Sequence, residues 1–153
     1  MIITTRLIHA LCLWSVHTAS IEAGSSRRYW RHQAPRALKV CQEVAKRAHK
    51  WGLDPLEVIA VSYVETRHNK KLVSSAGAVG PLQALLKYWA RKGDRDHITA
   101  GLRAWAYYRK KSDNTQEAAG RYNGGGEDSH YAVHVATHYR TLRMISRVAE
   151  WPQ

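Results

Sequence analysis

Glu65 is the residue of this sequence best suited to acid–base chemistry, because it ends a mostly apolar run, residues 56–64, and precedes a loop of small residues. If the run is a buried helix, both burial and the negative end of the helix dipole disfavour the ionised carboxylate and raise its pKa. A carboxyl group that keeps its proton near neutral pH can act as a general acid. The alternative is a structural ion pair between Glu65 and Arg67 or His68.

The helix that must position Glu65 has a clear start signal. Asp54 can cap it, Pro55 suits its first position, and Glu57 fits a capping-box-like arrangement. Because this helix is apolar on nearly every side, we expect it to be buried in the core.

The remaining pattern predicts an all-α domain without convincing strands. Helical spacing of apolar residues predicts helices over residues 35–51, 98–111, 117–122 and 129–149. Gly80-Pro81 is expected to open another helix, with Gln83 in its first turn facing the same cleft as Glu65. Residues 69–79 are expected to form a loop, and the glycines at 124–126 allow close backbone approach to a ligand.

Composition indicates a folded protein with an anionic partner. The 153 residues fit one domain, 44% are hydrophobic, and the formal net charge is +12. Such a charge suits a nucleic acid, a membrane surface or an acidic envelope polymer, and it equally suits a solvated basic surface.

The N-terminal region is predicted to be separate from the domain. Residues 1–23 have the basic start, short apolar run and small residues of an export signal, and the alternative is an N-terminal hydrophobic segment that stays attached. Residues 24–34 are predicted to be a basic linker, followed by the domain at 35–153. Removal of Cys12 with the signal leaves Cys41 as a free thiol, without an internal disulfide.

Two other patterns carry little chemistry. His130, His134 and His138 have helical spacing, but the helix offers no carboxylate or cysteine beside them, so packing against neighbouring side chains is favoured over a metal site. Ser74-Ser75 lacks the surrounding motif of a serine nucleophile.

Three motifs, in order, give this sequence a family resemblance. They are Glu65-Thr66, then Ser74 with Gly77-Ala78-Val79-Gly80-Pro81-Leu82-Gln83, then Tyr122-Asn123-Gly124-Gly125. With Ala100-Gly101-Leu102 between the second and third, the chain from about residue 35 onward resembles the soluble-type lytic transglycosylases, whose catalytic domain has a goose-type-lysozyme-like fold. The departures are Thr66 for Ser, Pro81-Leu82 for Leu-Met, and Gly124 for Ala. None of them removes a group that does chemistry.

The resemblance implies a glycan-binding cleft and cleavage of the β-1,4 bond between N-acetylmuramic acid and N-acetylglucosamine. Glu65 would serve as general acid and then base, giving a 1,6-anhydro sugar without consuming water. The implied substrate contacts are Ser74, Gly77, Gln83, Tyr122 and Asn123, with Tyr122 also orienting Glu65. Neither a metal nor another cofactor is implied.

The sequence agrees with a one-acid mechanism, because hydrolases generally need a second carboxylate about 5 to 9.5 Å away, and Asp94 is the first acidic residue after Glu65. A muramidase that uses water and a distant Asp, or a non-enzymatic basic module that binds cell wall or nucleic acid, is the alternative. The implied partner is the glycan strand of peptidoglycan, in the periplasm or cell wall, with no specific nucleic acid. A secretion or conjugation apparatus, or a phage virion, is the expected setting.

Overall fold

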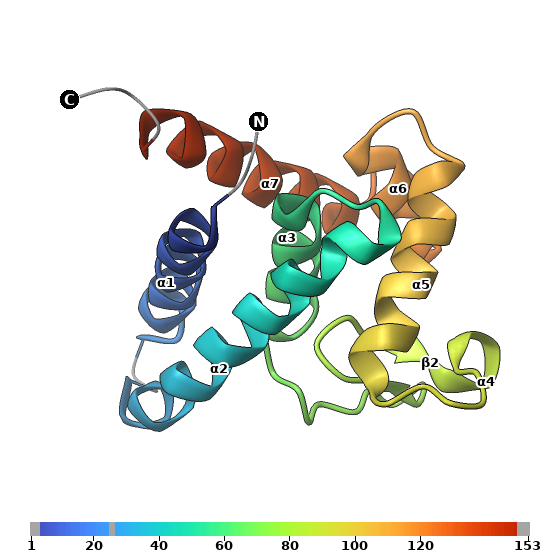
Figure 1. Ribbon diagram of the computed structural model, residues 1–153, viewed down its shortest axis with the longest axis horizontal. Helices are drawn as coiled ribbons and strands as arrows, with labels where there is room; N and C mark the ends of the chain where they lie inside the picture. Colours follow the sequence, from blue (N-terminus) through green and yellow to red (C-terminus); the bar gives the residue numbers. More distant parts are fainter. Residues whose placement is uncertain (1–3, 25–26, 150–153) are drawn as a thin grey trace.

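The computed structural model describes residues 4–24 and 27–149 (Figure 1). Residues 1–3, 25–26 and 150–153, on which parts of the predicted N-terminal segment, linker and domain fall, lie outside the described residues. The elements are α1 (Thr5–Glu22), α2 (Arg27–Ala48), the 3-10 helix η2 (His49–Trp51), α3 (Pro55–Thr66), β1 (Ala78–Val79), β2 (Ala84–Leu85), α4 (Leu86–Trp89), α5 (His97–Lys110), α6 (Thr115–Asn123) and α7 (His130–Ala149). The predicted all-α class is confirmed, apart from one short hairpin.

Helix α3 forms the centre of the core, as its apolar sequence predicts. It packs against α1, α2 and α7 (Figure 1), and its residues 58–61 are fully buried. Asp54 caps it by accepting a 2.8 Å hydrogen bond from the backbone N–H of Leu56. The Tyr139 hydroxyl donates to the other oxygen of Asp54, which fixes the start of α3 on α7.

Glu57 does not have the capping role that its spacing suggests. Its carboxylate is buried and accepts hydrogen bonds from Arg109 Nε (2.9 Å) and Thr115 Oγ1 (2.6 Å). The reason is tertiary: α3 is enclosed, and a buried carboxylate is stabilised more by a cation and a hydroxyl than by one backbone donor. Glu57 therefore ties α3 to α5 and α6.

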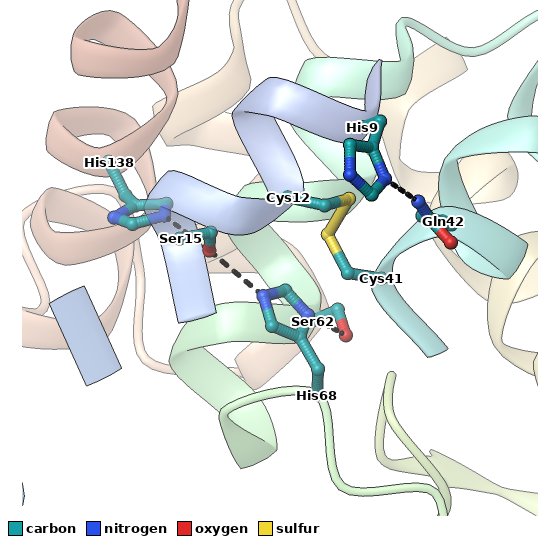
Figure 2. The surroundings of a disulfide bond; sticks show 8 residues. All are labelled: His9, Cys12, Ser15, Cys41, Gln42, Ser62, His68 and His138. Carbon is teal, nitrogen blue, oxygen red and sulfur yellow. Dashed lines mark hydrogen bonds between the residues drawn. A yellow bond between two sulfur atoms is a disulfide. The ribbon is translucent and has the colours of Figure 1, made fainter. Parts of the chain in front are cut away.

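Helix α1 is part of the same core and is covalently attached to it. Leu11, Cys12 and Ser15 are fully enclosed, and Cys12 forms a disulfide with Cys41 of α2 (Figure 2). A free Cys41 thiol is expected only for a chain that has lost residues 1–23; with α1 present, Cys41 is bonded to Cys12. Packing of α1 along α2 brings the two Cα atoms to 5.7 Å, a normal separation for a disulfide.

The predicted linker is also corrected. Residues 27–34 belong to α2, and Pro35 lies inside this helix rather than in its first turn. Pro35 is exposed, and because it has no N–H, the helix lacks the backbone hydrogen bond that a residue at this position would donate. Helix α2 ends at Ala48, short of the predicted end at residue 51; η2 follows it, and Gly52 after η2 has the left-handed conformation at φ 65°.

The helix predicted to open at Gly80-Pro81 is absent from the described structure. The chain instead turns through residues 80–83 and pairs β1 with β2, before the four-residue helix α4. Gln83 has φ 47°, a left-handed conformation that a helix cannot contain. Gly101 allows this hairpin to approach α5 closely, since a Cβ there would lie 2.6 Å from the Cβ of Leu82.

Among the described residues, no helix combines the length and apolar character needed to cross a membrane.

Candidate functional site

Glu65 lies in the last turn of α3, with its carboxyl group largely enclosed. Burial raises its pKa to about 7, although the hydrogen bond from Tyr131 acts in the opposite direction. The Tyr131 hydroxyl donates to Oε1 at 2.7 Å. Oε2 has no hydrogen-bond partner among the described residues, so a substrate oxygen can still use it. At neutral pH this carboxyl is divided between its acid and base forms, which suits proton transfer in either direction.

Tyr131 takes the position beside Glu65 that was predicted for Tyr122. The Tyr122 hydroxyl donates instead to the backbone carbonyl of Leu82. Tyr122 still lies close to the acid. Burial, and then the charge of the nearby Glu65, raise the pKa of Tyr122 well above its usual value. The same two causes, in the same order, raise the pKa of Tyr131. The site thus contains one carboxyl group and two phenols that stay protonated.

Glu65 does not form the alternative ion pair with Arg67 or His68, because both of these side chains have other partners. Arg67 pairs with Glu22 of α1 at 3.1 Å and lies 4.2 Å from the centre of the Tyr63 ring. His68 is buried and hydrogen-bonds to Ser15 and Ser62. Glu65 has no ion pair within the described part of the chain.

The backbone after Glu65 is held in an unusual conformation. Arg67 and His68 both have positive φ, 54° and 64°, which is uncommon for residues with side chains. The Thr66 hydroxyl supports this turn: it accepts from Asn69 N at 2.9 Å and donates to the Pro81 carbonyl at 3.3 Å. The Thr66 hydroxyl thus joins the end of α3 to the hairpin.

Ser74 and Gln83 hold the loop together through their side chains. Ser74 Oγ accepts from Ala78 N at 3.0 Å. The Gln83 amide donates to the carbonyls of Leu72 and Gly80, at 3.1 and 2.9 Å. The donors of Gln83 are thus used within the protein, while its side-chain oxygen has no partner among the described residues.

The glycine candidates have positions that require glycine or favour it. Gly77 is exposed with φ 80°. A Cβ on Gly80, which has φ 76°, would lie 2.9 Å from the Cβ of His97. Asn123 is exposed at the end of α6, where Gly124 follows in the left-handed conformation. Gly77 and Asn123 therefore both remain accessible to a ligand.

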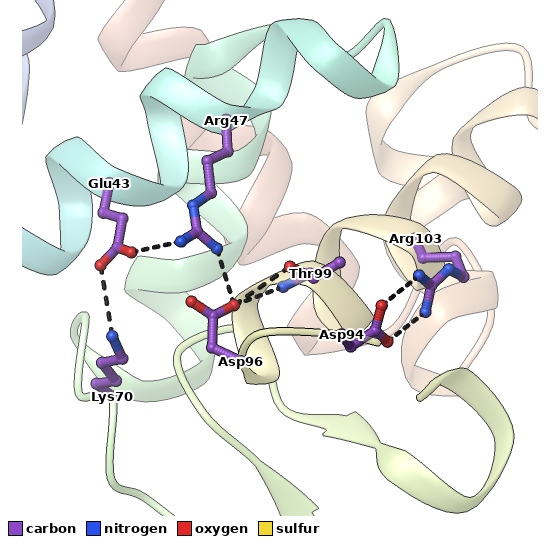
Figure 3. A network of polar contacts seen from close by, with 7 residues as sticks. All are labelled: Glu43, Arg47, Lys70, Asp94, Asp96, Thr99 and Arg103. Atoms are coloured by element: carbon purple, nitrogen blue, oxygen red, sulfur yellow. Dashed lines mark hydrogen bonds and ion pairs between the residues drawn. The ribbon is translucent and has the colours of Figure 1, made fainter. Parts of the chain in front are cut away.

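The other candidate carboxylates are engaged in structural ion pairs. Asp94 binds Arg103 through both oxygens, at 2.7 and 2.8 Å (Figure 3), and these hydrogen bonds lower its pKa to about 2. Asp96 caps α5 and pairs with Arg47 at 2.8 Å. Burial alone would raise the pKa of Asp96, but the bonds from Arg47 and Thr99 lower it.

The histidines of α7 are explained largely by packing. His138 stacks on Tyr63 with ring centres 3.8 Å apart, and its Nε2 shares the Ser15 hydroxyl with His68 (Figure 2). Burial lowers the pKa of both His68 and His138 to about 3. These neutral rings join α1, α3 and α7 behind Glu65. Within residues 4–24 and 27–149, no three His, Cys, Asp or Glu side chains form a metal-binding group.

Comparisons of the chain with protein-family models, curated proteins and solved structures found no match. The site therefore rests on its own geometry. From the sequence, Tyr131 is predicted only to belong to the last helix, residues 129–149. Its position in the first turn of that helix, just after a glycine-rich loop, is the signal that could have found it.

Proposed function

We propose that the protein is a peptidoglycan lytic transglycosylase that cleaves the bond between N-acetylmuramic acid and N-acetylglucosamine. The observation that carries the proposal is the buried Glu65 carboxyl group, whose pKa is raised to about 7 and which has one oxygen held by Tyr131. Residues of the second and third motifs lie next to this carboxyl group. Tyr122 is close to Glu65, and its hydroxyl donates to the backbone carbonyl of Leu82.

In the proposed reaction, protonated Glu65 donates its proton to the glycosidic oxygen as the bond to the anomeric carbon breaks. The resulting carboxylate then takes the proton of the muramic acid 6-hydroxyl, whose oxygen attacks the anomeric carbon. The 1,6-anhydro ring closes, Glu65 regains its proton, and no water is consumed. The substrate's acetamido group stabilises the positive charge that develops between these steps.

The charged residues around Glu65 favour a mechanism with one catalytic carboxyl group over a mechanism with two. Hydrolysis by the usual mechanisms needs a second carboxylate across the bond. Burial and Tyr131 account for the shifted pKa of Glu65, without a contribution from another carboxylate. Asp94 and Asp96 are each paired with an arginine. These pairings favour the transglycosylase over a muramidase that uses water and a distant Asp.

The proposed substrate position is a lysozyme-like cleft between the end of α3, the hairpin and the α6–α7 turn. These elements meet at Glu65, Leu82 and Tyr122. The exposed residues Gly77 and Asn123 would contact the glycan on either side of the acid. Gln83 would contribute its side-chain oxygen.

We place this activity outside the cytoplasm, in the periplasm or cell wall, with a phage virion as the alternative setting. The Cys12–Cys41 disulfide supports an oxidising compartment. The buried face of α1 supports the alternative in which the N-terminal segment stays attached, since its removal would expose the core. A secretion or conjugation apparatus remains the proposed partner beside the wall polymer.

Replacement of Glu65 by Gln tests the proposal. The amide keeps the shape and the Tyr131 hydrogen bond but cannot donate a proton as a carboxylic acid does. We expect Glu65→Gln to lose at least about a thousandfold of its lytic rate on purified sacculi, with unchanged circular dichroism. Glu117→Gln, in the first turn of α6 where Glu117 pairs with Arg121, is the matched control and should lyse normally. Equal activity of the two variants would overturn the role of Glu65.

A further inference from the structure

Two hollows adjoin the segment that follows Glu65. The first, about 450 Å³, lies between α2 and residues 66–71. The second, about 460 Å³, lies between residues 70–73, β1 and the start of α5. Both are lined by Lys70 and Lys71, so the two hollows adjoin at these lysines, and we name them together the basic groove. It begins at Thr66, the residue next to the proposed acid.

The basic groove carries unneutralised positive charge. Arg36, Lys39, Lys71 and Arg95 are exposed along it and have no carboxylate partner among the described residues. Its acidic residues are already engaged. Glu43 pairs with Arg47 at 2.8 Å and with Lys70 at 3.5 Å, and Asp96 pairs with Arg47 (Figure 3). The complementary ligand is therefore anionic.

Small apolar surfaces alternate with these cations. Ala37 and Val40 line the first hollow, and Leu72 and Val73 line the second. Leu72 is 41% and Val73 is 62% exposed, although both are large apolar side chains. Trp30 is the only Trp or Tyr among the described lining residues, whereas sequence-tolerant binding of single-stranded nucleic acid uses successive aromatic platforms. Carboxylates separated by small apolar side chains match the groove better.

The segment between the two hollows is fixed before any ligand binds. Its Leu72 carbonyl accepts from Gly80 N at 3.0 Å and from the Gln83 amide at 3.1 Å. Val73 pairs with Val79, and Lys71 N donates to Asn69 at 2.9 Å. A prebuilt surface loses less entropy on binding than a mobile one. The motif residue Gln83 thus also positions the lysines.

We propose that the basic groove binds the carboxylate-bearing stem peptides of the wall polymer while the glycan strand lies at Glu65. This assignment rests on the proposed function, because it makes the groove a second contact for the same substrate. The peptide's carboxylates would lie against Lys39 and Lys71, and its alanine methyl groups would lie against the apolar floor. The groove would then favour peptide-bearing strands over bare glycan.

The test measures binding separately from cleavage. The inactive Glu65→Gln protein is sedimented with intact sacculi and with sacculi whose peptides an amidase has removed. We expect intact sacculi to bind about fivefold to tenfold more tightly. The added changes Lys39→Glu and Lys71→Glu should abolish that difference, since each replaces a favourable charge contact with a repulsive one.

The matched control reverses two charges on another face. Arg140→Glu and Arg147→Glu on exposed positions of α7 change the net charge equally and should leave the preference for intact sacculi unchanged. Equal loss in both double variants, or equal binding to both kinds of sacculi, would overturn the assignment. So would binding of double-stranded DNA that is as tight as sacculus binding and is lost with the same two lysines.

The two proposals can fail separately. Wild-type digestion of peptide-free strands to anhydro products, without any peptide preference, would retain the catalytic proposal and overturn the groove. A peptide preference in a protein that yields no anhydro product would retain the groove's ligand and overturn the catalytic proposal.

Discussion

The hydroxyl of Tyr131 donates a 2.7 Å hydrogen bond to Oε1 of Glu65, joining the first turn of α7 to the last turn of α3. This bond stabilises the ionised carboxylate and so restrains the rise of its pKa. In Tyr131→Phe the pKa of Glu65 should rise above 7. The alkaline limb of the pH–rate profile, where the general acid loses its proton, should move upward by about 0.5 to 1 pH unit.

Tyr139→Phe is the matched control, because it removes a similar phenol–carboxylate bond at the other end of α3. It should lower stability without moving the alkaline limb. An identical pH profile for Tyr131→Phe and the wild type would show that Tyr131 is only a packing residue.

The raised pKa of Glu65 also has a consequence for stability. A carboxyl that ionises near pH 4.5 when unfolded but near 7 when folded costs the folded state free energy as pH rises between these values. Glu65→Gln should therefore be more stable than the wild type by about 3 kcal/mol at pH 8, and nearly equal to it at pH 4. Urea denaturation of both proteins at these two pH values measures this change. A difference independent of pH would refute the raised pKa.

The buried histidines should make stability rise with pH, opposite to the effect of Glu65. His68 and His138 have folded pKa values of about 3 against an ordinary 6.5, so the unfolded chain binds protons first as the pH falls. The contribution of these two groups to the free energy of unfolding is fully present above pH 6.5 and is lost as the pH falls toward 3. The loss should reach about 2 kcal/mol per histidine at pH 5. Urea denaturation at pH 7 and 5, in Glu65→Gln so that this carboxyl does not titrate, tests it.

Two substitutions on α7 test whether the loss of stability between pH 7 and pH 5 comes from the buried histidines. His138→Phe keeps a ring on Tyr63 and should remove about half of the acid-dependent loss. His130→Gln, at an exposed position, should change nothing. If stability in the Glu65→Gln background is the same at pH 7 and pH 5, the two histidines are not buried as neutral rings.

The Cys12–Cys41 disulfide leads to expectations for both the mass and the stability of the chain. The protein recovered from its native compartment should contain residues 5–22 and be lighter than its reduced form by two hydrogens. Replacing Cys12 and Cys41 with serine should reduce the free energy of unfolding by about 3 to 4 kcal/mol, given the 29-residue separation. Intact-mass measurement and denaturation test these two values. A mature chain starting after residue 23 would show that α1 is removed.

Local signals in the sequence were sufficient to locate Glu65. Asp54 and Pro55 start α3, and the apolar composition of the run places the helix in the core, as the structure has it. Asp96 and Asn114 cap α5 and α6 through side-chain bonds to the backbone, which short-range patterns also predict. These features depend on neighbours within a few residues.

The features that sequence analysis missed all depend on distant contacts. Tyr131 is 66 positions from Glu65, and its place just after the glycine-rich loop does not by itself show which residue it contacts. The Cys12–Cys41 disulfide was not predicted, because a 29-residue separation does not reveal a pairing. The hairpin was mistaken for a helix because the left-handed conformation of Gln83 is held by Leu72, eleven residues earlier.

The most direct test of the central claim is mass spectrometry of the muropeptides released from purified sacculi. If Glu65 protonates the leaving oxygen and then takes the proton of the 6-hydroxyl, the wild-type digest will contain 1,6-anhydromuramic ends, each lighter than a reducing end by one water. The Glu65→Gln digest will contain neither product. Reducing muramic acid ends alone in the wild-type digest would contradict the account and show that water, activated by a second carboxylate, cleaves the strand.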